Sequence, residues 1–120
     1  MKSLTLEEQA ELLAERFEKG VKNGFGAVVI MYSINKRHNA SSQEIRKDLK
    51  EMFPKSMEYN YTSFYRLLGK LRDELKLIRE SERRKAKGPE RIYYSLTPLG
   101  KLVLKKIFHR YLKPLANLKL

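Results

Sequence analysis

Hydrophobic positions near the N-terminus recur at helical spacing. Thr5 and Glu8 stand in the positions of a capping box, and Gly20 follows as a stop signal. The pattern predicts a first helix within residues 1–20 and a second, mostly apolar helix from about Phe25 to Asn35. The apolar positions of the first helix are Leu6, Ala10, Leu13 and Phe17.

Two further helices are predicted in the middle of the chain. Ser41 and Glu44 form a clearer capping box, and Pro54 ends the helix that they begin. Its inward residues are Ile45, Leu49 and Met52. Asn60 or Thr62 then opens a longer helix whose apolar stripe contains Phe64, Leu67, Leu68, Leu71 and Leu75.

The pattern changes to a two-residue period after residue 77. Two strands are predicted, over 77–84 and 91–96, joined by a turn that contains Gly88 and Pro89. Ile92, Tyr94 and Leu96 share one face of the second strand. Thr97 is the expected cap of a final helix, with Pro98 as its first residue.

This order of elements predicts a mainly α protein with a small β-hairpin, of the α+β class. Three helices followed by a hairpin are the elements of a winged helix-turn-helix, here with additional N- and C-terminal helices. We expect a single domain over residues 1–120. It comprises an N-terminal helix (1–20), a winged-helix core (25–96) and a C-terminal dimerisation helix and tail (97–120).

Charge points to the class of partner. The formal net charge is +12 and the pI is about 10, which favours a polyanionic partner. Nucleic acid is the leading candidate and an anionic membrane the second. Cysteine is absent, the N-terminus is unlike a signal peptide, and the longest apolar run, residues 27–32, is too short to span a bilayer. We therefore expect a soluble intracellular protein.

Catalytic motifs are absent from the sequence. There is no P-loop, GxSxG or HExxH motif and no cluster with metal-ligand spacing. His38 and His109 stand far apart in the chain, without flanking acidic motifs. We predict that the protein is not an enzyme, and we predict no cofactor and no metal.

The helix after Asn60 has a polar outer face suited to the major groove of DNA. On this face Arg66 matches guanine edges or phosphate, and Lys70 matches phosphate. Hydroxyl groups near the helix start, where backbone amides also favour phosphate, extend the contact set. These residues are Tyr61, Thr62, Ser63 and Tyr65, and Ser42 at the start of the preceding helix is included with them. The alternative is an ordinary solvated face.

The predicted hairpin is crowded with cations. Its tip, residues 83–87, has four cations and no acid. Such a wing suits sugar-phosphate or minor-groove contact, whereas the alternative is protection of an exposed strand edge by charge. The predicted contacts are Arg83, Arg84, Lys85, Lys87 and Arg91.

The last helix has an apolar surface that covers almost half of its circumference. That width predicts burial on two sides, against the rest of the domain and against a second protomer. The residues are Val103, Leu104, Ile107, Phe108, Tyr111 and Leu112. The first helix is acidic, whereas residues 91–120 contain no acid, so Leu6, Leu13 and Phe17 are the expected counterpart across a twofold axis. The alternative is an ordinary terminal helix.

Two segments resemble the PadR-like transcription regulators. SFYRLLGKL (63–71), followed by Leu77-Ile78, resembles their recognition helix and first wing strand. GPERIYYSLTPLG (88–100) resembles their returning strand and the start of the last helix, although the turn 74–78 lacks the glycine usual in that family. MarR-like and divergent archaeal or viral winged-helix regulators are the alternatives.

The resemblance implies a homodimer built with the terminal helices and an operator of pseudo-twofold symmetry. We therefore predict a sequence-specific regulator of transcription, a repressor, that binds double-stranded DNA in the cytoplasm at the nucleoid. Members of the family often respond to small molecules near the dimer interface, and the sequence leaves such an effector open. The alternative function is a winged-helix module that binds other proteins without specific DNA binding.

Overall fold

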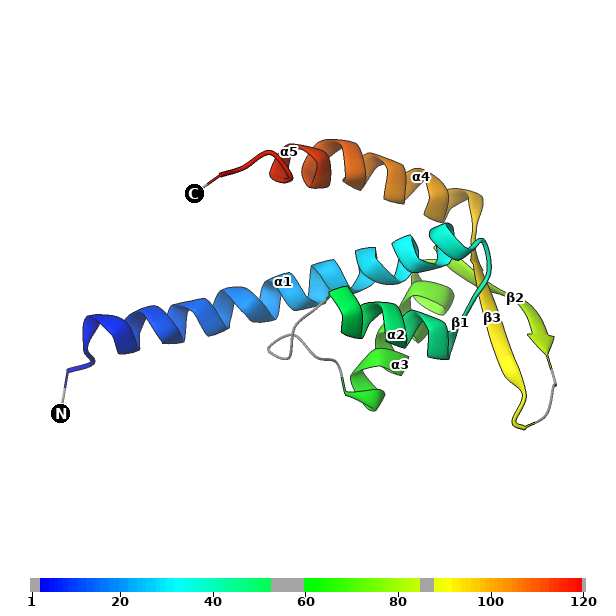
Figure 1. Ribbon diagram of the computed structural model, residues 1–120, viewed down its shortest axis with the longest axis horizontal. Coiled ribbons are helices and arrows are strands. Elements are labelled where there is room, and N and C mark those ends of the chain that lie inside the picture. Colours follow the sequence, from blue (N-terminus) through cyan, green and yellow to red (C-terminus); the bar gives the residue numbers. More distant parts are fainter. Residues whose placement is uncertain (1–2, 53–59, 85–87, 120) are drawn as a thin grey trace.

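A small sheet lies at one end of a group of helices in the computed structural model, which describes residues 3–52, 60–84 and 88–119 (Figure 1). The helices are α1 (Leu6–Arg37), α2 (Ser42–Met52), α3 (Tyr61–Gly69), α4 (Pro98–Ile107) and α5 (Lys113–Leu115). π-Helical turns continue α3 over Lys70–Glu74 and α4 over Phe108–Leu112. The strands are β1 (Ala40–Ser41), β2 (Ile78–Arg84) and β3 (Arg91–Leu96). The predicted fold class, a winged helix with added terminal helices, is confirmed.

The first helix is longer than the sequence pattern indicates. The predicted end at Gly20 and the predicted new start near Phe25 are wrong, because α1 runs unbroken to Arg37. Its capping box at Thr5 is formed as expected. An internal glycine costs a helix only about 1 kcal/mol, which burial of the C-terminal half of α1 readily offsets. The helix ends instead at His38, whose φ of 66° is left-handed.

The two helices of the helix-turn-helix begin at the predicted caps. Ser41 and Glu44 exchange both hydrogen bonds of a capping box at the start of α2. The Asn60 side chain accepts a hydrogen bond from the Ser63 N–H, 2.7 Å away, and so caps α3. Met52, which was predicted to face inward, is half exposed at the end of α2. The predicted stop at Pro54 lies outside the described residues.

The hairpin belongs to a three-stranded antiparallel sheet with the order β1-β3-β2. The predicted strands correspond to β2 and β3, which pair from Ile78–Leu96 at the root to Arg84–Arg91 near the tip. We call β2, β3 and the turn that joins them the wing. Strand β1, only two residues long, was not predicted, because so short a strand has no periodicity of its own. Gly88 takes a φ of 115°, which a glycine adopts without strain.

The core lies where α1, α2 and α3 meet the sheet. Tyr94 and Leu96 are buried as expected, and Leu104 of α4 joins them. The helical part of the core contains Ile30, Ile34, Ile45, Leu49, Phe64, Leu68 and Leu71. Leu75, which was predicted to continue the apolar stripe, is instead exposed. The Leu75 N–H bonds the Lys70 carbonyl in a π-helical turn, and this wider turn rotates Leu75 off the stripe.

Candidate nucleic-acid interface

The recognition helix α3 is fixed by its apolar side, so that its polar side faces solvent. Phe64 and Leu68 are buried against the core, and Leu71 extends this anchor into the π-helical turn. Arg66 and Lys70 lie on the opposite, exposed side with Thr62, and Ser63 is half-buried beside them. The structure therefore gathers on one surface most of the predicted α3 contacts. The side chain of Tyr61 lies outside the described part of the chain.

Two cations of this surface have no ion-pair partner among the described residues. In the described ranges 3–52, 60–84 and 88–119, neither Arg66 nor Lys70 takes part in an ion pair. The acid that shares the face, Asp73, is held by the Arg72 guanidinium through two hydrogen bonds of 2.8 and 2.9 Å. These hydrogen bonds hold the pKa of Asp73 below its usual range. The negative charge of Asp73 therefore compensates the positive charge of Arg72. Arg66 and Lys70 are left available to an anion.

Two predicted contacts are joined across the helix-turn-helix. The Tyr65 hydroxyl donates a 3.1 Å hydrogen bond to the Ser42 hydroxyl at the start of α2. Ser42 is only 8% exposed, so its place in the structure is first of all a contact between helices. Arg46, on α2, lies over the Phe64 ring, 5.9 Å from its centroid, and was not among the predicted residues. This contact depends on the packing of α2 on α3, and no sequence motif signals it.

Two arginines of the wing form ion pairs. Arg83 contacts Glu80 at 3.1 Å and Glu90 at 3.9 Å. Arg84 pairs with Glu82, which raises the pKa of its guanidinium, and it also lies 4.4 Å from the centroid of the Tyr93 ring. Arg91 is exposed, directly across from Arg84 in the register. The predicted contacts Lys85 and Lys87 lie outside the described residues.

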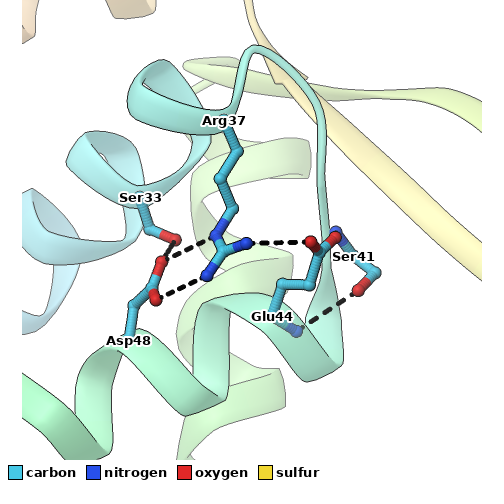
Figure 2. A network of polar contacts seen from close by, with 5 residues as sticks. All are labelled: Ser33, Arg37, Ser41, Glu44 and Asp48. Carbon is cyan, nitrogen blue, oxygen red and sulfur yellow. Dashed lines mark hydrogen bonds and ion pairs between the residues drawn. The ribbon is translucent and has the colours of Figure 1, made fainter.

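A polar network holds α1 against α2 and so sets the position of the helix-turn-helix (Figure 2). The Arg37 guanidinium donates to both carboxylate oxygens of Asp48, at 3.0 and 2.8 Å, and to Glu44 at 2.9 Å. The Ser33 hydroxyl donates to the same Asp48 carboxylate, which is nearly buried. Four side chains from two helices thus form hydrogen bonds with one another in a single network. This network could not be predicted from the sequence, because its partners are 7 to 15 residues apart and follow no motif.

The network shifts the ionisation of its acids. Hydrogen bonds from Arg37 hold the pKa of the Asp48 carboxyl below its usual range, and the bond from Ser33 adds to this effect. The backbone N–H of Ser41 lowers the pKa of Glu44, with a further contribution from Arg37. Both carboxylates are therefore ionised at neutral pH, when they tie Arg37 to α2.

The predicted dimerisation residues divide between core and surface. Leu104 is buried in the protomer's own core, while Val103, Ile107 and Leu112 are half-buried. Tyr111 is 60% exposed and Phe108 is 47% exposed. On α1, Leu6 is 84% exposed and Leu13 is also exposed, whereas the side chain of Phe17 is outside the described part. The terminal helices thus expose apolar side chains that one protomer does not cover.

No group of three or more His, Cys, Asp or Glu side chains in residues 3–52, 60–84 and 88–119 is placed to hold a metal ion. Over the same ranges, no helix combines the length and the apolar character needed to cross a bilayer.

The sheet order, the capped helix-turn-helix and the charged wing define a winged-helix protein. A model of the PadR-like family of transcriptional regulators matches residues 30–106, which is more than half of the chain. The chain therefore belongs to the PadR-like family, whose members are DNA-binding regulators of transcription. The predicted resemblance is confirmed.

Two solved structures share the fold of this chain. A PadR-like transcription factor from Bacteroides fragilis aligns with a TM-score of 0.65 and 24% identity, covering 84% of this chain and 93% of that one. A protein described as a transcriptional regulator from Thermoplasma acidophilum aligns with a TM-score of 0.60 and 24% identity, covering 78% and 83%. At this identity the likeness shows the fold alone. A comparison with curated proteins finds no match.

Proposed function

We propose that the protein is a sequence-specific repressor that binds double-stranded DNA as a homodimer. The observation that carries this proposal is the exposed face of α3, on which Arg66 and Lys70 have no acidic partner among the described residues while Asp73 is engaged by Arg72. A face that is cationic and uncompensated attracts a polyanion. No catalytic activity and no cofactor are assigned.

In the proposed complex α3 enters the major groove. Arg66 reads a base edge, and a guanine offers the two acceptors that a guanidinium fork matches. Lys70 and the hydroxyls of Thr62 and Ser63 contact phosphates on either side and fix the register. Because Ser42 and Tyr65 are hydrogen-bonded to each other, they orient α3 through α2 and contact the DNA backbone only at the edge of the interface.

The wing contacts the adjacent backbone or minor groove. In the free protein Arg83 pairs with Glu80 and Glu90, and Arg84 pairs with Glu82. All three ion pairs are exposed to solvent. Exposed ion pairs contribute little to stability, so a phosphate group can replace a carboxylate at small cost. Arg91 and the lysines of the wing turn add further cations.

Dimerisation supplies the second half of the site. The exposed apolar residues of α1 and α4 pair across a twofold axis, and the acidic start of α1 faces the basic C-terminal helices. Two recognition helices then contact half-sites about 34 Å apart, one helical turn of DNA. A protein with this role acts in the cytoplasm at the nucleoid, where it blocks transcription by occupying a promoter.

Selection of bound duplexes from a random DNA pool tests the proposal. We expect a pseudo-twofold motif that binds at least about 10³-fold more tightly than a scrambled duplex of the same composition. A reporter promoter that contains the motif should be transcribed less when the protein is present. Enrichment of no motif, with no binding of any duplex at micromolar protein in about 0.1 M salt, would instead favour the protein-interaction module.

A further inference from the structure

A cleft lies at the root of the wing, apart from the proposed DNA surface. It encloses about 370 Å³, near the lower end of the range for small-molecule sites. The end of α1, both wing strands and the start of α4 all contribute to it. It is lined by Ile34, Asn35, His38, Arg79, Ser95, Leu96 and Lys101, and we call it the wing-root cleft.

The described residues that line the cleft include two cations and no acid. Arg79 and Lys101 are exposed, and neither forms an ion pair with any residue of 3–52, 60–84 or 88–119. This distinguishes Arg79 from Arg83 and Arg84, which are paired on the same strand. The acid next to Arg79 in the sequence, Glu80, projects to the other face of β2 and is engaged by arginines there.

The other lining groups complete a site for an oxyanion. The Arg79 Nε donates to the Ser95 hydroxyl at 3.3 Å, which orients the guanidinium and leaves its two terminal nitrogens as donors. The Asn35 amide and the His38 ring add hydrogen-bonding groups at the end of α1. Ile34 and Leu96, both buried, form an apolar floor. Arg79 and Lys101, which have no ion-pair partner among the described residues, together match the charge of a dianion.

The cleft is separated from α3 and from the wing tip. In Figure 1, α4 lies on one side of α1, and α2 and α3 lie on the other. Lys101 therefore reaches the cleft from the side of α1 opposite to the recognition helix. Along β2, Arg79 is about 16 Å from Arg84 at the rise of an extended strand. A ligand in the cleft is therefore distinct from the DNA backbone at α3 or the wing tip.

We propose that the wing-root cleft binds a small dianion, either a phosphate group or a dicarboxylate. Arg79 and Lys101 provide the charge, and Asn35, Ser95 and His38 provide hydrogen bonds. A bound dianion would link α1, the wing and α4, which in the free protein meet at this cleft.

Amide NMR titrations with inorganic phosphate and with succinate, at constant chloride, test the proposal. We expect saturable shifts centred on His38, Arg79 and Lys101 with at least one of the two, and the one that binds identifies the ligand class. Acetate and chloride should give no saturation over the same range. Arg79→Gln and Lys101→Gln should each weaken binding by roughly tenfold or more, as for loss of one charge-assisted hydrogen bond. Lys105→Gln, the same charge change one turn further along α4, should leave affinity unchanged.

Three results would overturn it. The first is the absence of saturation with both dianions, and the second is an equal loss of affinity in Lys105→Gln, which would mean general attraction to a basic protein. The third concerns the salt slope of DNA binding, which is the change of the logarithm of the binding constant with the logarithm of salt concentration. A smaller slope in Arg79→Gln would make the cleft a DNA-backbone contact. Failure of the dianion titrations leaves DNA binding intact, so this proposal and the proposed repressor function fail separately.

Discussion

Gly100 lets the first turn of α4 pack directly on the backbone that leads into the wing. A Cβ atom at this position would lie 2.0 Å from the Leu77 carbonyl oxygen. The neighbouring Thr97 holds the same junction, since its hydroxyl donates to the Lys76 carbonyl at 2.8 Å and accepts from the Gly100 N–H at 3.0 Å. The glycine at the end of the sequence LTPLG is therefore required by a close approach of two backbones.

Gly100→Ala should destabilise the fold, because the methyl group meets backbone that has no rotamer with which to yield. We expect a loss of about 1–3 kcal/mol, the usual cost of overpacking, in urea unfolding. Gly69→Ala is the matched control, since a Cβ there meets nothing within 4 Å, and it should stabilise α3 by about 0.5–1 kcal/mol. Equal effects of the two substitutions would contradict the close-approach account.

Asp48→Asn should weaken the attachment of α1 to α2. The folded-state pKa of Asp48 is lowered by its hydrogen bonds with Arg37, so its stabilisation is present at neutral pH and is lost as pH falls through that pKa, below the ordinary value of about 3.9. At pH 7 the variant should lose about 1–3 kcal/mol, as for a hydrogen bond to a charged group. The gap to wild type, measured by urea unfolding, should shrink between about pH 5 and pH 2. A gap that is constant with pH would exclude an ionised Asp48 as the cause.

At the scale of elements, the parts of the fold with local causes could be predicted. The caps at Thr5, Ser41 and Thr97 follow from local sequence and were predicted correctly, and Asn60, one of two predicted candidates, is the cap of α3. The break at Gly20 was wrong because glycine lowers helix propensity without forbidding the helix. The exposure of Leu75 was missed because a π-helical turn changes the period. The partners of Arg37 and the lining of the wing-root cleft depend on tertiary packing, which no local pattern records.

The charges of the wing could likewise be predicted only in part from the sequence. The sequence placed cations on it but could not show that Arg83 and Arg84 are paired with glutamates in the free protein. Arg84→Gln should therefore lower the salt slope of DNA binding by about one unit across all sequences. Glu82→Gln should raise DNA affinity, because it frees Arg84 from its carboxylate and removes a repulsive charge. Fluorescence anisotropy titrations over about 50–200 mM salt measure both effects. Changes of DNA affinity with the same sign in Arg84→Gln and Glu82→Gln would refute the wing contact.

The whole molecule is more extended than a compact domain of its length. Its radius of gyration is 17.1 Å, against about 14 Å for a compact domain of this length. The excess comes from α1, whose N-terminal half projects beyond the winged-helix core in Figure 1. This projecting half and the C-terminal helices carry most of the exposed leucines and aromatic residues among the described positions. A twofold dimer would cover both.

Phe108→Glu should break the proposed dimer, because it places a charge within the apolar surface that α4 and the π-helical turn after it share. Sedimentation at tens of micromolar should show a dimer for the wild type and a monomer for the variant. Leu75→Glu is the matched control, since Leu75 is 46% exposed, as Phe108 is at 47%, but lies at the end of the α3 segment. It should stay dimeric. A wild-type protein that sediments as a monomer would refute the dimer.

Reading of DNA sequence by α3 is the central claim, and the affinity of Arg66→Ala for two duplexes tests it most directly. On the selected duplex the variant should bind about 1–3 kcal/mol more weakly than wild type, whereas on the scrambled duplex the loss should be much smaller. Lys36→Ala, which removes an exposed cation from α1, should change neither. The same loss on both duplexes would contradict base reading by Arg66 and reduce its role to a phosphate contact.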